Sequence, residues 1–145
     1  MRKSEIKQGV KSIMEAITTA RENIDEFLQP YKDIKEHLEA IQSIEEDNGL
    51  ETGFDYEEIE NDTLRSCISE SGDIQDIENQ FEMLMSDLEN WQDESSEKKS
   101  EQIQEQYVDV LSEIKESFDI DSIECEEDVD DRLYDMINSL EDMEI

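Results

Sequence analysis

Apolar side chains recur at steps of four and three residues through the first third of the chain. The series runs without a miss through Ile6, Val10, Ile13, Ile17, Ala20, Ile24, Phe27, Tyr31, Ile34, Leu38 and Ile41. A seam with this spacing is typical of a helix that packs against another helix. It predicts helices over about residues 4–28 and 30–46, because proline is tolerated in a first helical turn and disrupts a helix interior. The pattern alone leaves open whether Pro30 kinks one helix or separates two.

Asp55 marks the expected start of the next helix, over about residues 55–69. Its carboxylate can cap the first turn, and Phe54 can pack against Ile59 across that turn. Ser71-Gly72-Asp73 is expected to form a turn after this helix.

The same helical spacing resumes in the second half of the chain. It predicts helices over about residues 74–91 and 101–118, joined by a wholly polar connection at residues 92–100. Residues 121–124 match a capping box and place the start of a last helix there. The side chains expected to face the core of these helices are Ile74, Ile77, Phe81, Leu84, Leu88, Trp91, Ile103, Tyr107, Val110, Leu111, Ile114, Phe118, Val129, Leu133, Met136, Ile137, Leu140 and Met143.

These elements predict an all-α fold, a helical bundle of about five or six helices. Four glycines and one proline in 145 residues argue against a turn-rich β fold. The length suits a single domain over residues 1–145. Within it, residues 1–46 form a heptad-patterned spine and residues 55–145 form an acidic helical body.

Charge separates these two parts sharply. Residues 1–42 hold seven Lys/Arg and eight Asp/Glu, whereas residues 43–145 hold five Lys/Arg and thirty-six Asp/Glu. The net charge of the chain is −32, and 39% of its residues are charged. A chain with this charge and scattered apolar residues would be disordered, but here the apolar residues are periodic. We therefore expect an ordered protein whose outer faces are hyperacidic, with raised pKa values where carboxylates crowd one another.

No catalytic or cofactor motif is present. The sole histidine, His37, has charged neighbours and no nucleophile beside it, and the glycines form no phosphate-binding loop. Cys67 and Cys125 lack the clustered partners of a zinc site. The acidic segments 47–58 and 119–130 lack the glycine that an EF-hand requires at its sixth place. We expect no enzyme activity, cofactor or metal.

The sequence also bears on compartment. The first ten residues contain no apolar segment of the kind found in secretory signals, and no apolar run approaches the roughly 18 residues of a membrane span. Two cysteines make no disulfide framework. We therefore expect a cytoplasmic protein with reduced thiols and no membrane association.

The charge points to the kind of partner. Direct nucleic-acid binding is disfavoured, because phosphates would meet carboxylates and not Lys or Arg. Two or three helices of the acidic body, lying side by side, would approach the charge density of duplex DNA, which is about one charge per 1.7 Å of axis. A basic protein surface that binds nucleic acid is therefore the expected partner. The candidate acidic surface comprises Glu57, Glu58, Glu60, Asp62, Asp73, Asp76, Glu78, Glu82, Asp87, Glu89, Glu124, Glu126, Glu127, Asp128, Asp130, Asp131 and Asp135.

In composition and charge distribution the chain resembles the phage and plasmid DNA-mimic proteins. Those are small, strongly acidic and often helical, and they inhibit restriction enzymes, CRISPR nucleases or other DNA-handling proteins. The resemblance implies an inhibitor encoded by a phage or plasmid that acts in the host cytoplasm. Two other functions fit the same charge, an acidic coiled-coil adaptor or scaffold and a chaperone-like shield for basic proteins. The seam of residues 6–41 is also long enough to pair two copies as a homodimer.

Overall fold

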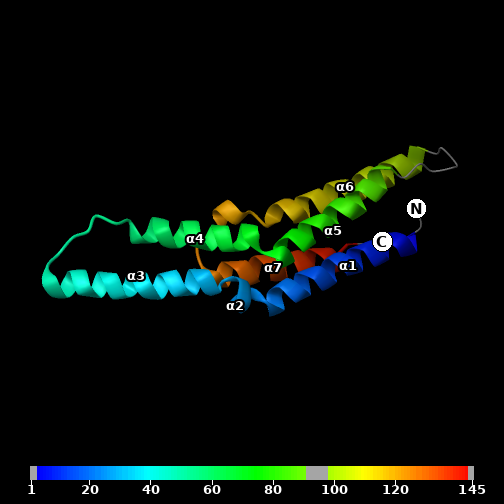
Figure 1. Ribbon diagram of the computed structural model, residues 1–145. Coiled ribbons are helices and arrows are strands. Elements are labelled where there is room, and N and C mark those ends of the chain that lie inside the picture. The colour runs from blue at the N-terminus through cyan, green and yellow to red at the C-terminus, as the bar shows by residue number, and fades with distance from the viewer. Residues whose placement is uncertain (1–2, 91–97, 144–145) are drawn as a thin grey trace.

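The computed structural model in Figure 1 describes residues 3–90 and 98–143, with side chains described for all of these except residues 98–103. The described elements are α1 (Lys3–Glu22), α2 (Ile24–Phe27), α3 (Gln29–Asn48), α4 (Tyr56–Glu70), α5 (Gly72–Glu89), α6 (Lys98–Ser117), a 3₁₀ turn (Ile120–Ser122) and α7 (Glu126–Glu141). The described residues contain no strand, which confirms the all-α prediction. The count of seven helices exceeds the expected five or six because the spine divides into three.

Helices α1, α5, α6 and α7 form a four-helix bundle. Both α1 and α6 pack against α5 and against α7, so α1 and α6 lie on a diagonal of the bundle. Each helix buries one apolar stripe, as amphipathic helices in bundles do. The centre contains Ile17, Phe81, Leu111 and Leu133, which are fully buried. Val110 was expected to face inward but is 39% exposed, because it lies at the edge of the apolar stripe of α6.

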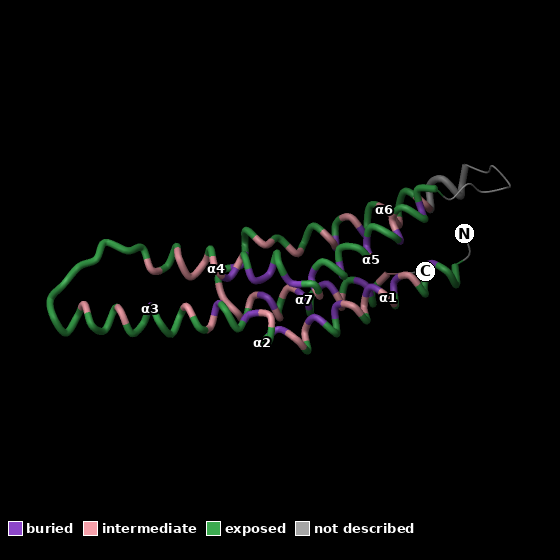
Figure 2. Tube along the Cα trace, in the orientation of Figure 1, coloured by how far each residue is buried: buried purple, intermediate pink, exposed green. Residues whose placement is uncertain are grey.

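Helices α3 and α4 form a hairpin that extends beyond one end of the bundle (Figure 1). Figure 2 shows that buried residues become sparse along it. On α3, Leu38 is 6% exposed, whereas Ile44 near the tip is 58% exposed. The predicted seam is therefore buried from Ile6 to Tyr31 by side chains of the same chain. A second copy would have only the part beyond Tyr31 on which to pack.

The spine is interrupted earlier than predicted. The expected helix over residues 4–28 ends at Glu22. Asn23 separates α1 from the short α2, and Leu28 separates α2 from α3. Pro30 lies in the first turn of α3 and has no N–H to bond to the carbonyl four residues earlier. The seam resumes in phase after the interruption, because Ile24 and Tyr31, seven residues apart, are both buried. At the turn itself Leu28 is fully buried, whereas the predicted seam residue Phe27 is only half-buried.

The start of α4 matches the prediction only in part. Asp55 caps α4 as predicted, accepting a 3.1 Å hydrogen bond from the backbone N–H of Glu58. Phe54 was expected to pack on Ile59, but it is 54% exposed and meets the ring of Tyr56 edge-on. Every residue of the loop at positions 49–55 is exposed.

The predicted turn at residues 71–73 is wrong. Ser71 alone joins α4 to α5, and its buried hydroxyl accepts a hydrogen bond from the N–H of Ile74. Gly72 already belongs to α5. The serine acts as an N-cap, which lets two helices meet with one residue between them.

The last helix also begins later than predicted. Residues 121–124 do not form a capping box, and α7 starts at Glu126. Ile123 is fully buried, so it anchors an extended segment where the first turn of the helix was expected. The expected core positions Trp91 and Ile103 lie outside the residues whose side chains are described.

Candidate functional site

The candidate acidic residues all lie on the surface, and none is buried. The exposed members are Glu57, Glu58, Asp62, Asp76, Glu78, Glu82, Asp87, Glu89, Glu124, Glu127, Asp131 and Asp135. The half-buried members are Glu60, Asp73, Glu126, Asp128 and Asp130. They are spread over three helices, α4, α5 and α7, and the segment just before α7.

Several of the half-buried carboxylates hold the fold together. Asp130 on α7 accepts a 2.9 Å hydrogen bond from Nε of Arg21 on α1, and Arg21 also lies over the ring of Tyr134. Glu126 lies 3.1 Å from Nζ of Lys32. These pairs dock the start of α7 against the spine. The acidic run at residues 124–135, whose acids belong to the candidate acidic surface, is therefore partly a structural contact.

Asp128 and Asp73 also have partners within the chain. Asp128 accepts a 3.1 Å hydrogen bond from the backbone N–H of Glu124, which lowers the pKa of its carboxyl. Asp73 accepts a hydrogen bond from the side-chain amide of Asn23. Both contacts fix connections between helices, so these two carboxylates belong to the scaffold.

What remains outward on α7 is a stripe of three carboxylates. Glu127, Asp131 and Asp135 follow at four-residue steps and are all exposed, and Glu127 also interacts with the thiol of Cys125. Four residues rise about 6 Å along a helix, so the stripe presents evenly spaced negative charges.

A second stripe runs along α6 and was missed in the sequence. Glu105, Asp109 and Glu113 are exposed at the same four-residue steps, followed by Glu116. The four-residue spacing was the available signal, but these acids are interleaved with apolar residues and do not form a dense run. Their significance comes from the neighbouring helix, because α6 packs alongside α5 (Figure 1).

Acids of α5 lie on the side of that helix that faces α6. Glu82 pairs with Lys115 of α6 at 3.2 Å, which shows that this side of α5 faces α6. Glu78 and Glu89 share that side, since they lie four residues before and seven residues after Glu82. We call the combined surface the α5–α6 acidic face; its members are Glu78, Glu82, Glu89, Glu105, Asp109, Glu113 and Glu116.

The charge density of this face can be compared with that of DNA. The paired segments cover about 12 residues of each helix, or roughly 18 Å. With Lys115 subtracted, the face carries roughly one net negative charge per 3 Å, against about one per 1.7 Å in duplex DNA. Two helices therefore reach more than half the charge density of a duplex.

The few cations of the acidic body do little to neutralise it. Of those with described side chains, only Lys115 pairs with a carboxylate. Arg65 donates to the carbonyl of Asp121, and Arg132 donates to the hydroxyl of Ser122 at 2.9 Å. Both arginines fix the connection between α6 and α7.

Acids at the C-terminal ends of several helices also lower helix stability. The last turns of α3, α4, α5 and α7 contain no basic residue. They contain acids, such as Asp87 and Glu89 on α5. A carboxylate near a helix C-terminus opposes the helix dipole and costs about 0.3–1 kcal/mol at low ionic strength. Helix stability therefore does not explain this placement.

The expected rise in carboxylate pKa values is absent from those described acids whose pKa departs clearly from its usual value. The pKa of Asp25 is lowered by its hydrogen bond with Lys32, and that of Glu45 by hydrogen bonds from Thr52 and Tyr56. Asp128 behaves in the same way. At these three positions local hydrogen bonds outweigh the surrounding negative charge.

The described residues provide no group of three or more His, Cys, Asp or Glu side chains arranged to hold a metal ion. Cys67 is buried, and burial raises the pKa of its thiol. Within the described ranges, none of the helices combines the length and the apolar content needed to cross a membrane. Comparison of the chain with protein-family models, curated proteins and solved structures finds no match.

Proposed function

We propose that this protein is a DNA-mimic inhibitor that binds the nucleic-acid-binding surface of a DNA-handling protein, such as a restriction or CRISPR nuclease. The observation that supports it most is the α5–α6 acidic face, where two helices that pack together carry seven exposed carboxylates and only one of these pairs with a lysine. The α7 stripe of Glu127, Asp131 and Asp135 adds a second row of charge.

The energetic cost of the charge also supports this proposal. Solvation alone would be served by acids and bases interspersed for local pairing. Here acids occupy helix C-termini, and self-repulsion opposes compaction. Surface residues that lower stability are expected where function requires them. A complementary basic surface would relieve this repulsion and would be steered to the face from a distance.

The test uses two variants with equal changes in net charge. The face variant carries Glu105→Gln, Asp109→Asn and Glu113→Gln on α6. The control carries Glu15→Gln, Glu22→Gln and Glu26→Gln, three exposed acids of the near-neutral spine. Immobilised wild-type protein and both variants are incubated with a lysate of the host cell, and bound proteins are eluted with a duplex oligonucleotide at several salt concentrations.

We expect wild type and control to capture the same DNA-binding protein and to release it to duplex DNA in a salt-sensitive way. The face variant should bind it at least about tenfold more weakly, because it loses half of the net charge of the face. Equal capture by all three proteins, or a partner that duplex DNA does not release, would contradict the proposal.

The adaptor alternative is favoured by a different observation. Ile44, Leu50 and Phe54 are each more than half exposed at the tip of the α3–α4 hairpin. Exposed apolar clusters mark interaction sites in soluble proteins. If the hairpin tip is the main binding site, Ile44→Ser with Phe54→Ser should abolish capture and the face variant should not.

A further inference from the structure

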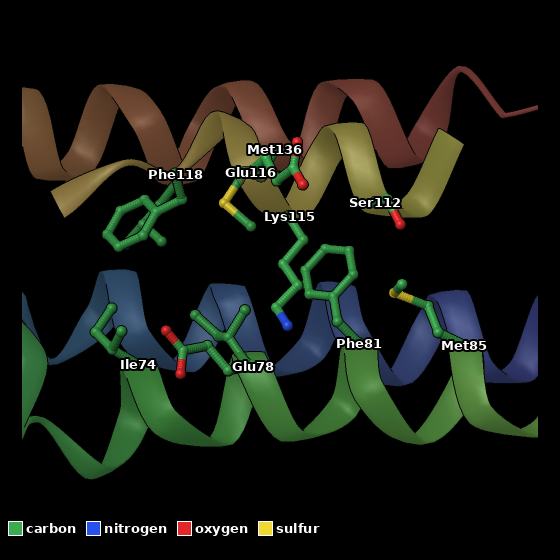
Figure 3. Close-up of a pocket in the computed structure, with 11 residues that line it drawn as sticks. Ile74, Glu78, Phe81, Met85, Ser112, Lys115, Glu116, Phe118 and Met136 are labelled. Carbon is green, nitrogen blue, oxygen red and sulfur yellow. The ribbon is translucent and has the colours of Figure 1, made fainter. Parts of the chain in front are cut away.

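A hollow of about 280 Å³ lies between α5, α6 and α7, within the α5–α6 acidic face. Its walls are mainly apolar, with Phe81 and Met85 from α5, Met136 from α7, and Phe118 just beyond α6 (Figure 3). Ile74, Ile77 and Leu133 complete the apolar lining. The wall thus includes side chains that form part of the bundle core.

Charged groups of the acidic face surround this hollow. Glu78 and Glu116 line it together with Lys115, whose ammonium group reaches across from α6 to Glu82 on α5. Figure 3 shows Lys115 extending between the two helices, close to Phe81. Three carboxylates against one ammonium leave the surroundings negative. An anionic ligand such as a fatty acid would be repelled there, and a cationic one would be attracted.

We propose that the hollow receives a single apolar side chain, aromatic or branched, carried by a basic segment of the partner protein. The inference rests on the proposed function, because the acidic face must first attract that segment. The volume suits such a side chain, since a cavity of about 150 Å³ is enough to bind benzene. Met85 and Met136 can adjust to its shape because methionine side chains are flexible and polarizable.

This pocket would give the protein a binding feature that charge alone does not provide. Charge alone gives attraction that any basic surface can share, whereas an apolar anchor in a pocket selects among basic partners. When the protein competes with duplex DNA for the partner, its binding would then depend partly on this apolar contact as well as on charge.

The experiment uses two synthetic peptides of Lys and Arg that are identical except for one central residue, Phe in one and Ser in the other. Their affinities are measured by calorimetry at low and moderate salt. We expect the Phe peptide to bind at least about tenfold more tightly, as expected for burial of one aromatic side chain.

Two variants locate the contact. Ser112→Phe fills the hollow from α6, where Ser112 lines it, and should remove the difference between the peptides. Ser86→Phe places the same side chain on α5 at an exposed position outside the lining and should preserve the difference. As a measurement independent of the variants, the methyl resonances of Met85 and Met136 should shift with the Phe peptide and not with the Ser peptide.

The outcomes distinguish the two proposals. If both peptides bind equally to the wild type with steep salt dependence, the pocket inference is wrong while charge-driven binding stands. If neither peptide binds, the attraction assumed for the acidic face fails as well. If the Phe peptide binds more tightly but the methyl resonances of Met85 and Met136 do not move, the anchor binds elsewhere and the assignment of this pocket is overturned.

Discussion

Acids at the C-terminal end of α5 should destabilise the protein, and their removal should therefore stabilise it. Asp87 and Glu89 occupy the last turn of α5, are exposed, and have no basic residue beside them in that turn. The perturbation is the double variant Asp87→Asn with Glu89→Gln. Its matched control is Glu57→Gln with Glu58→Gln, two exposed acids in the first turn of α4. Both variants remove two negative charges and keep the shape of the side chains.

The helix dipole should make the two variants change the free energy of unfolding in opposite directions. Each acid near a helix end contributes about 0.3–1 kcal/mol at low ionic strength, unfavourably at the C-terminus and favourably at the N-terminus. Relief of general self-repulsion is similar in both variants and cancels in the comparison. We expect the α5 variant to exceed the α4 variant in free energy of unfolding by about 1–4 kcal/mol, with about 2–4 °C in Tm for each kcal/mol.

Urea and thermal unfolding followed by far-ultraviolet circular dichroism would measure this difference. The comparison is made at about 10 mM salt and again near 1 M, where the screening length falls from about 30 Å to about 3 Å. The gap between the variants should largely disappear at high salt. Equal stabilisation of both variants at low salt would refute the dipole argument and leave net charge as the only cost.

Two further predictions concern the fold itself. A Cβ on Gly9 would lie 2.6 Å from Cδ1 of Leu84, so Gly9→Val should lower the free energy of unfolding by about 1–3 kcal/mol, and Leu84→Ala in the same chain should recover part of that loss in a double-mutant cycle. The lowered pKa of Asp128 means that this carboxylate stabilises the fold above its unfolded pKa, near 4, and loses that effect as the pH falls through its lower folded value. Asp128→Ala should therefore reduce stability at pH 7, and urea titrations should show the difference from wild type shrinking below about pH 4.

The fold was largely predictable because its signals are local and repeated. The seam from Ile6 onward fixed which face of the spine is buried, and Asp55 fixed the start of α4. The errors arose where one buried residue overrides a local pattern. Burial of Ile123 delays α7, and the cap at Ser71 replaces a turn. Neither could be inferred without knowing which side chains the bundle encloses.

The candidate site was predictable in kind but not in place. The sequence identifies an acidic body, but it does not show that Asp130 meets Arg21, 109 residues earlier in the chain. It also does not show that α6 packs beside α5, where Lys115 pairs with Glu82. Tertiary contacts decide which carboxylates serve the scaffold and which remain outward.

The position of α7 has a consequence for how the chain folds during synthesis. The α3–α4 hairpin uses contacts between near neighbours in sequence, so it can form while later residues are still being made. The bundle cannot, because α1 must await both α5 and α7 to cover its apolar stripe. A nascent chain therefore exposes Ile13 and Ile17 until translation has passed α7. Its accumulating negative charge would keep such incomplete chains apart before the bundle closes.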